Sequence, residues 1–266
     1  MAVLLVIPAR YASTRFPGKP LAELRGAGGE ARSLIRRSWD AAREVEGVDR
    51  VVVATDDERI AEAAAAFGAE AMLTPETCRN GTERCAAVAR ALGPGWDVIV
   101  NLQGDAPLTP PWFVSALVEA MATDPDCAVA TPVLRCDAAA LAGFVEDRRH
   151  GRVGATTAVF DRSGRALYFS KEVIPYTGRT LGPDERIPVF HHVGVYSYRR
   201  DALLAYDGWP EGPLEAWEGL EQLRFMENGI AVRCVEVEAQ GRAFWELNNP
   251  QDTPRIEAIL AAQGMP

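Results

Sequence analysis

Three basic side chains stand close together in the segment PARYASTRFPGKP near the start of the chain. Arg10, Arg15 and Lys19 follow Val3–Ile7, an apolar run that predicts a buried strand. Arginine forks and a lysine point charge neutralise polyphosphates, and a glycine among small residues lets the backbone approach a ligand. The spacing matches neither the Walker A loop nor the G-x-G-x-x-G dinucleotide loop. The segment therefore indicates another kind of phosphate-binding loop; the alternative is an exposed basic loop without a ligand.

An acidic residue follows a second predicted strand. Asp105 comes just after Val98–Leu102, in the segment QGDAP. Carboxylates at such strand ends commonly hold Mg²⁺ in α/β enzymes, and triphosphate chemistry requires a cation to offset charge. Asp105 is therefore a candidate Mg²⁺ ligand, and the alternative is that it only caps the next helix.

The elements that must position these loops alternate along the first half of the chain. The apolar runs predict strands, and the amphipathic stretches between them predict helices. Such alternation predicts an α/β fold with a mostly parallel central sheet flanked by helices, similar to a Rossmann fold. Loops at the carboxyl ends of parallel strands share one crevice, so the basic loop and Asp105 are expected to meet there. The expected strands are Val3–Ile7, Arg50–Ala54, Ala71–Leu73 and Val98–Leu102, and the expected helices are Ser33–Glu44, Asp57–Phe67 and Thr82–Leu92.

The second half predicts a β-rich elaboration of the same domain. A hairpin is expected from Thr156–Phe160 and Arg165–Ser170, with its turn at Ser163-Gly164. Further expected elements are a strand at Val193–Tyr198, a helix at Glu218–Asn228, a strand at Ile230–Val237 and a last helix capped by Asn249, with Pro250 at its first position.

Composition excludes several classes of protein. The chain has 266 residues and a formal net charge of −9, which argues against a surface built for polymeric nucleic acid. No apolar run is long enough to span a membrane, and the start does not resemble a signal peptide, so a cytoplasmic location is expected. The five cysteines are scattered and suggest neither a disulfide framework nor a zinc site. Since His191 and His192 are adjacent on a predicted strand, only one is expected to face a pocket.

Seven segments of the chain together resemble a known enzyme family. They are IPARYASTRFPGKPL, VVVATDD, NGTERCAAVA, VNLQGDAPLTPP, ALYFSKEVIPY, HVGVYSYR and GLEQLRFMENG. In this order they resemble the sugar-acid cytidylyltransferases, and among these the 3-deoxy-manno-octulosonate (Kdo) branch, over roughly residues 3–262. The phosphate loop and QGD elements are shared with CMP-sialate synthetases, whereas the YFS, H-x-G-x-Y and LEQLR elements resemble the Kdo branch alone.

The resemblance implies a Mg²⁺-dependent nucleotidyltransferase. Its reaction would transfer CMP from CTP to a 2-keto-3-deoxy sugar acid, giving CMP-Kdo for lipopolysaccharide or capsule and releasing pyrophosphate. It also implies a homodimer formed through the β-rich middle. One domain, 1–266, would comprise a nucleotide-binding half (1–135), a sugar-binding and dimerisation elaboration (136–240) and a C-terminal helix (241–266).

The resemblance also implies roles for particular residues. Arg10, Arg15, Lys19 and Asp105 would be catalytic. The nucleotide would lie against Ala9, Arg10, Ser13, Arg15, Lys19, Arg84 and Gln103. The sugar acid would lie against Tyr168, Lys171, His192, Tyr196, Glu221 and Gln222. The metal would be held by Asp105 and Asn248.

Three of these positions depart from the family pattern. Lys171 stands where the family usually has arginine, so it would pair with a carboxylate as a point charge. Ala106 replaces the glutamate of QGDEP, and Asn248 replaces the second metal-binding aspartate. Asn248 could ligate through its carbonyl oxygen, Glu246 or Asp252 could compensate, or the metal could depend on the nucleotide phosphates. Two alternatives follow: the same reaction on an amino-Kdo or sialate-like acid, and a CTP-binding paralogue without turnover.

Overall fold

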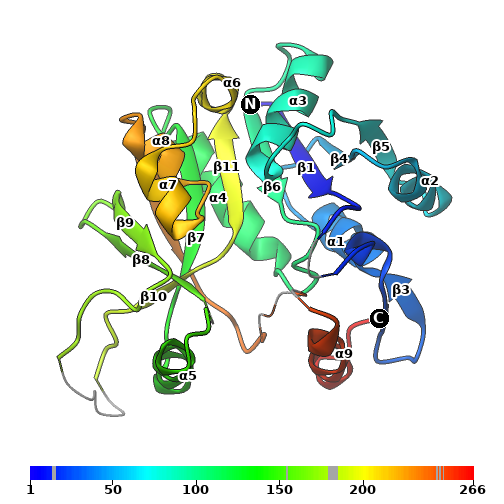
Figure 1. The fold of residues 1–266 in the computed structure, drawn as a ribbon. Coiled ribbons are helices and arrows are strands. Elements are labelled where there is room, and N and C mark those ends of the chain that lie inside the picture. The colour runs from blue at the N-terminus through cyan, green and yellow to red at the C-terminus, as the bar shows by residue number, and fades with distance from the viewer. Residues whose placement is uncertain (14–15, 154, 179–184, 244, 246, 248) are drawn as a thin grey trace.

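The structure is a computed structural model that describes residues 1–13, 16–153, 155–178, 185–243, 245, 247 and 249–266. Within them, ten strands form one sheet: β1 (Val3–Ala9), β4 (Arg50–Thr55), β5 (Glu70–Leu73), β6 (Val98–Leu102), β7 (Val129–Arg135), β8 (Thr156–Phe160), β9 (Ala166–Ser170), β10 (Phe190–His192), β11 (Val195–Arg199) and β12 (Val232–Val237). Their order is β5-β4-β1-β6-β11-β7-β10-β8-β9, with β12 on β7 (Figure 1).

The first half of the sheet is parallel, as the alternating pattern predicts. β5, β4, β1 and β6 all run the same way, and β1 lies in the middle with every residue buried. A parallel sheet must be covered on both faces, which explains why every residue of β1 and β6 is buried and why Asn101 is their only polar residue. The expected fold class is confirmed, and the four expected strands are present with nearly the expected bounds.

Helices cover both faces of this sheet. Successive side chains of a strand point to opposite faces, and along β1 Leu4 and Val6 pack on one side while Val3, Leu5 and Ile7 pack on the other. The first side is covered by α3 (Gly81–Leu92) and α6 (Arg200–Asp207). The second is covered by α1 (Leu34–Arg43), α2 (Glu58–Ala66) and α4 (Pro111–Thr123).

The second half of the chain contributes strands to the same sheet. β11 lies antiparallel between β6 and β7, with Tyr196 opposite Asn101. β10 continues along the same edge of β7, and β12 runs parallel to the other edge. The hairpin of β8 and β9 is present as expected, with Gly164 in the left-handed region and the Asp161 carboxylate closing the turn. Insertion of β11 therefore places residues of the elaboration beside the end of β6.

The expected single helix at Glu218–Asn228 is wrong. The structure instead has two short helices, α7 (Pro213–Glu218) and α8 (Leu223–Glu227). Gly219 has a φ of +60° and ends α7, because a glycine adopts the left-handed conformation without steric cost. The two residues that follow, Glu221 and Gln222, therefore lie on a turn rather than on a helix face. The expected end at Asn228 is confirmed, since this residue terminates α8.

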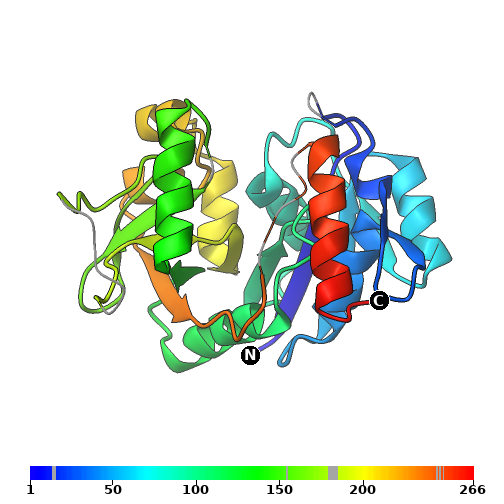
Figure 2. The same ribbon diagram turned by 90° about the horizontal axis from the view of Figure 1, so that it is seen from below.

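Two further helices lie in different halves of the molecule. In Figure 2, α5 (Ala138–Arg149) stands in the half with the elaboration and α9 (Thr253–Ala262) in the half with the parallel strands. α9 packs on the small hairpin of β2 (Glu23–Arg25) and β3 (Ala31–Ser33). The expected start of this last segment is confirmed: Asn249 and Asp252 form a capping box around a short 3₁₀ helix, Pro250–Asp252, that leads into α9. A second 3₁₀ helix spans Lys19–Leu21. No helix in the described part of the chain is long and apolar enough to cross a membrane.

Candidate active site

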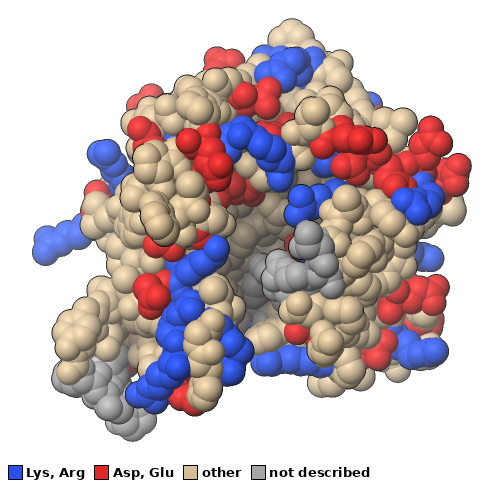
Figure 3. Space-filling model, viewed as in Figure 1, with Lys and Arg blue, Asp and Glu red and all other residues tan. Residues whose placement is uncertain are grey.

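A cleft of about 1440 Å³ opens between the parallel half and the elaboration. Figure 3 shows this cleft as a hollow near the centre of the side of the molecule that faces the viewer. One wall comes from the loops after β1 and β6 and from the start of α3; the other comes from α5, β10, β11 and the turn after α7. The predicted residues that line it are Ala9, Arg10, Ser13, Lys19, Arg84, Gln103, Asp105, Lys171, His192, Tyr196, Glu221 and Gln222. Arg10 and Gln222, which are 212 positions apart in the chain, thus line one cavity. The roles given to all of these residues stay predictions.

The basic loop and the QGD segment lie against each other. The Lys19 ammonium forms an ion pair with the Asp105 carboxylate, with 2.6 Å between Nζ and Oδ2. Gly104 permits this contact, because a Cβ there would lie 2.8 Å from the Pro8 carbonyl oxygen. Arg10 is exposed and borders the cleft, while Arg15 lies outside the described residues. The expected meeting of the two loops is confirmed.

The C-terminal segment reaches the same point. The Leu247 N–H donates to the Asp105 carbonyl oxygen at 3.0 Å, and the Leu247 side chain is fully buried. Glu246 and Asn248 themselves lie outside the described residues, and Asp252 is used in the capping box. No group of three or more acidic, histidine or cysteine side chains suited to a metal occurs in the part of the chain that is described.

The start of α3 forms the adjoining part of this wall. Asn80 caps the helix by accepting from the Glu83 N–H at 2.9 Å. Arg84 is buried and donates to the Asp56 carboxylate at 2.7 Å. Asp57, in turn, caps α2 by accepting from the Arg59 N–H, at the expected start of this helix. The pairing of Arg84 with Asp56 explains how an arginine can remain charged at the base of the cleft.

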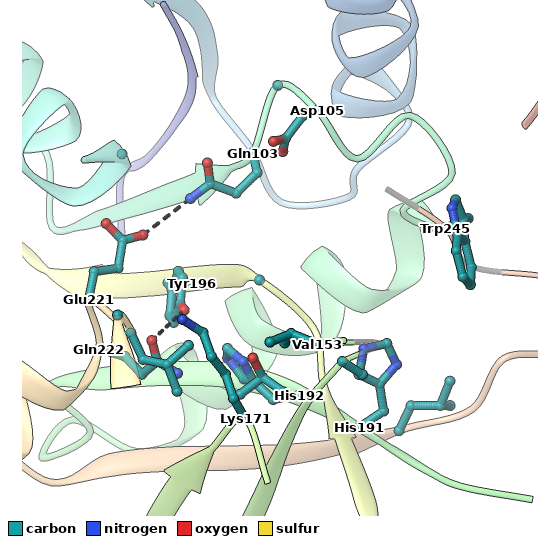
Figure 4. Close-up of a pocket in the computed structure, with 18 of the residues that line it drawn as sticks. Gln103, Asp105, Val153, Lys171, His191, His192, Tyr196, Glu221, Gln222 and Trp245 are labelled. Atoms are coloured by element: carbon teal, nitrogen blue, oxygen red, sulfur yellow. Dashed lines mark hydrogen bonds between the residues drawn. The ribbon is translucent and has the colours of Figure 1, made fainter. Parts of the chain in front are cut away.

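A hydrogen bond joins the two walls. The Gln103 amide donates to the Glu221 carboxylate, with 3.2 Å between Nε2 and Oε1, as Figure 4 shows. The other oxygen of Glu221 accepts from the Thr82 N–H at the start of α3, at 3.3 Å. Burial raises the pKa of Glu221 to about 7, against the hydrogen bonds from Thr82 that lower it. Gln103, predicted to face the nucleotide, is therefore bonded to Glu221, predicted to face the sugar acid.

The opposite wall carries a set of uncharged polar groups. The Tyr196 hydroxyl donates to Gln222 Oε1 at 3.1 Å (Figure 4). The amide nitrogen of Gln222 has no hydrogen-bond partner among the described residues, although this residue is only 2% exposed. A buried donor without a partner is costly, so Gln222 is suited to donate to a bound ligand.

His192 is held as a neutral imidazole in the same wall. Its Nε2 lies 2.9 Å from the Thr131 hydroxyl, and that hydroxyl donates to the Val195 carbonyl at 2.8 Å. The hydroxyl has one proton, so His192 Nε2 must be the donor, which leaves Nδ1 as an acceptor. Burial lowers the pKa of His192 to about 3. The ring is therefore an uncharged hydrogen-bonding group at neutral pH.

Lys171 supplies a cation to this wall. Its side chain points into the cavity (Figure 4), and its Nζ lies within 2.7 Å of where a Cβ on Gly219 would be. The chain has 28 basic residues but only two lysines, and both of them, Lys19 and Lys171, line the cleft. Their scarcity is a signal in the sequence that singles out both positions.

Tyr168 is not among the residues that line the cleft, so its predicted contact with the sugar acid stays a prediction; burial and the nearby Glu218 carboxylate raise the pKa of its hydroxyl. One expectation about the lining is wrong. His191 as well as His192 borders the cleft, although only one was expected, because β10 is three residues long and ends beside the cavity. His191 also packs edge-on against Phe144 of α5.

Several lining residues carry no motif. α5 contributes Asp137, Phe144 and Asp147, and the C-terminal part contributes Arg242, Trp245 and Arg255. The Arg255 guanidinium lies 3.4 Å from the centre of the Trp245 ring. Neither α5 nor the segment before α9 shows a spacing that marks chemistry, so only the fold identifies these residues.

This combination of a parallel sheet, a phosphate-type loop and a polar cleft defines a nucleotidyltransferase. The family model described as "Cytidylyltransferase" matches residues 4–236. The chain belongs to the cytidylyltransferase family.

Several of the similar proteins share one name. A protein of Maricaulis maris called 3-deoxy-manno-octulosonate cytidylyltransferase is 46% identical over 264 residues, covering 99% of both chains. One of the same name from Chlamydia pneumoniae is 38% identical and covers 96% of this chain and 92% of its own. A solved structure of CMP:2-keto-3-deoxy-manno-octonic acid synthetase complexed with CTP has a TM-score of 0.84 and 35% identity, over 99% of this chain and 100% of its own. The chain is thus a member of the 3-deoxy-manno-octulosonate cytidylyltransferases.

Proposed function

We propose that this protein transfers CMP from CTP to 3-deoxy-D-manno-octulosonate and releases pyrophosphate, with Mg²⁺ as cofactor. The observation that carries the proposal is the composition of the cleft. The paired Lys19 and Asp105 lie on one wall, and Lys171, His192 and Gln222 lie on the other. The names of the relatives support CTP and the sugar acid as the two substrates.

The nucleotide wall is suited to a triphosphate. Arg10, Arg15 and Lys19 would neutralise the phosphate oxygens and the charge that develops on the leaving pyrophosphate. Mg²⁺ fits Asp105, since this ion is commonly held by one or two carboxylates together with substrate phosphates. Asn248 would be its second protein ligand. When bound there, Mg²⁺ would supply further neutralisation of the phosphate charge.

The opposite wall is suited to a polyhydroxylated acid. Lys171 would pair with the carboxylate, Gln222 would donate to a hydroxyl, and His192 would accept from one. These contacts would align the anomeric hydroxyl oxygen with the α-phosphorus of CTP. A new oxygen–phosphorus bond forms, the bond to the bridging oxygen of pyrophosphate breaks, and the hydroxyl proton is released.

Pyrophosphate release tests the proposal. The purified protein would be incubated with CTP and Mg²⁺, with and without Kdo, and UTP would replace CTP in a control. Release that requires both CTP and Kdo is the expected result. Release with an amino-Kdo or a sialate-like acid, but not with Kdo, would keep the reaction and change the acceptor. CTP binding without release on any acid would identify a non-catalytic paralogue.

We also propose that the protein is a homodimer that acts in the cytoplasm. Apolar side chains on the elaboration support an interface there: Leu167 is 60% exposed, Leu214 is 42% exposed and Trp217 is 90% exposed. Large exposed apolar groups of this kind often mark contact surfaces. Light scattering coupled to size-exclusion chromatography would give twice the chain mass if the proposal is right, and Trp217→Glu would lower that mass.

A further inference from the structure

The backbone of Lys171 is held by a carboxylate from a distant part of the chain. Glu218, the last residue of α7, accepts the Ser170 hydroxyl through Oε1 at 2.7 Å. Its other oxygen, Oε2, accepts the Lys171 N–H at 2.9 Å. Glu218 thus fixes two successive residues just where β9 ends and the pairing with β8 stops.

The next peptide unit, which contains the Lys171 carbonyl, is also held. The Arg148 guanidinium, from α5, donates to the Lys171 carbonyl oxygen at 3.0 Å. The Ser170 hydroxyl in turn accepts from the Glu172 N–H at 3.0 Å. Side chains therefore replace the strand pairing that Lys171 lacks. Because a lysine side chain has four flexible bonds, a fixed backbone is needed to direct its ammonium to one place.

The turn that supplies Glu218 also makes room for the ammonium. Gly219 follows Glu218 with a φ of +60°, and a Cβ on it would lie 2.7 Å from Lys171 Nζ. Among the described residues, no ion pair joins this ammonium to a carboxylate, and both Glu218 oxygens accept hydrogen bonds from Ser170 and the Lys171 N–H. The charge of Lys171 is therefore available to a ligand.

We propose that Glu218 is the positioning residue of the acceptor-carboxylate site: it holds the Lys171 backbone so that the ammonium points at the carboxylate of the sugar acid. This inference rests on the proposed function, in which Lys171 pairs with that carboxylate. Ser170, which donates to Glu218, supports the site without lining the cleft.

Steady-state kinetics of four proteins test the inference: wild type, Lys171→Met, Glu218→Ala and the double variant. Lys171→Met should raise the KM for the sugar acid roughly 10- to 100-fold, as expected for loss of a charge-assisted contact. Glu218→Ala should raise it about tenfold or more through misplacement of the ammonium, and should leave the KM for CTP unchanged. If Glu218 acts through Lys171, the double variant should match Lys171→Met alone.

Asp161→Ala is the matched control. Asp161 accepts the Ser163 hydroxyl at 2.6 Å and the Ser163 N–H at 2.8 Å on the same hairpin, but it does not line the cleft. Its loss should lower the melting temperature without changing either KM.

Reductive methylation provides a readout that does not depend on turnover. The chain has only two lysines, so mass spectrometry separates their labelling rates, and Lys19 serves as the internal reference. Glu218→Ala should change the labelling rate of Lys171 and leave that of Lys19 unchanged. In the wild type, Kdo should protect Lys171.

The outcomes separate the two proposals. If Lys171→Met leaves the KM for the sugar acid unchanged, the role of Lys171 in the proposed function is wrong. Two results would overturn only the positioning role of Glu218, provided that Lys171→Met raises the KM for the sugar acid. One is a Glu218→Ala variant that behaves like Asp161→Ala; the other is a double variant in which the effects of Lys171→Met and Glu218→Ala on this KM add. Should Glu218→Ala fail to fold, Glu218→Gln keeps one acceptor oxygen, and a wild-type KM in that variant would overturn the inference equally.

Discussion

The guanidinium of Arg224 and the carboxylate of Glu83 form a buried ion pair, 3.1 Å from Nη1 to Oε1, between residues 141 positions apart in the chain. Arg224 also donates two hydrogen bonds of 2.6 Å to Glu215. Burial alone would lower the pKa of Arg224, but the hydrogen bonds to Glu215 and Glu83 raise it above its ordinary value. The pair fastens α8 to α3, and so fixes the turn that carries Glu221 against the start of α3.

Arg224→Met should therefore destabilise the protein strongly. The change leaves the buried Glu215 carboxylate without its cation and leaves Glu83 with Arg79 alone, which costs about 3–5 kcal/mol of unfolding free energy. Urea unfolding measures it. Arg90→Met on α3 is the control, because Arg90 is 56% exposed in its pair with Asp207 and should contribute no more than about 1 kcal/mol. Equal losses in the two variants would contradict the importance of the buried pair.

Glu221 should make stability depend on pH. Its pKa is about 7 in the folded protein against an ordinary 4.5, so between these values the folded state binds a proton that the unfolded chain has lost. Rising pH across this window therefore removes stability. Glu221→Gln cannot titrate, so its unfolding free energy relative to wild type should increase from about pH 5 to about pH 7.5.

Urea unfolding at several pH values measures this difference. Glu119→Gln, on the exposed face of α4, is the control and should give a difference that does not change with pH. A flat difference for Glu221→Gln as well would show that this carboxyl titrates normally.

Gly104→Ala should disturb the contact between the phosphate loop and the QGD segment. The added Cβ would lie 2.8 Å from the Pro8 carbonyl oxygen, a backbone atom that cannot rotate away. We expect a loss of about 1–3 kcal/mol and a raised KM for CTP. Gly95→Ala meets nothing within 4 Å and should stay within about 0.5 kcal/mol of wild type. Thermal unfolding and kinetics on both variants decide this.

Asn248→Asp should lower the Mg²⁺ concentration needed for half-maximal activity. The hydrogen bond from Leu247 N–H to the Asp105 carbonyl brings this part of the chain to the predicted metal ligand. A carboxylate binds a hard cation more strongly than an amide oxygen does. A Mg²⁺ titration of activity measures the shift, and the KM for Kdo should stay constant. An unchanged titration would show that position 248 does not limit metal binding.

Elements with strong local signals could be predicted from the sequence. β1 is continuously apolar, β6 is apolar apart from Asn101, and Asn249 with Pro250 marks the start of the last segment. The prediction of a single helix at Glu218–Asn228 was wrong. The apolar residues of this segment suggested a continuous helix, whereas its one glycine, Gly219, ends α7. The small hairpin of β2 and β3 was not predicted, since each strand has only three residues and packs on α9 from the far end of the chain.

The residues of the site also fall into two groups, those that the sequence identifies and those that only the structure identifies. Lys19, Asp105 and Gln222 belong to motifs and could be named from the sequence. The sequence could not show that Asp56 pairs with Arg84, because 28 positions separate them. Nor could it show that Glu218 holds Lys171, because 47 positions separate these two residues. Tyr168, which belongs to a family motif, is not among the residues that line the cleft, and its predicted role stays a prediction.

The sequence by itself determined which residues carry the chemistry and which strands are buried, because side-chain type and apolar periodicity are local properties. Only the tertiary structure decided which residues face each other. The antiparallel insertion of β11 between β6 and β7 sets Tyr196 opposite Asn101 and so places the acceptor wall beside the phosphate wall. Strand pairing between distant segments depends on the whole topology, and no local pattern encodes it.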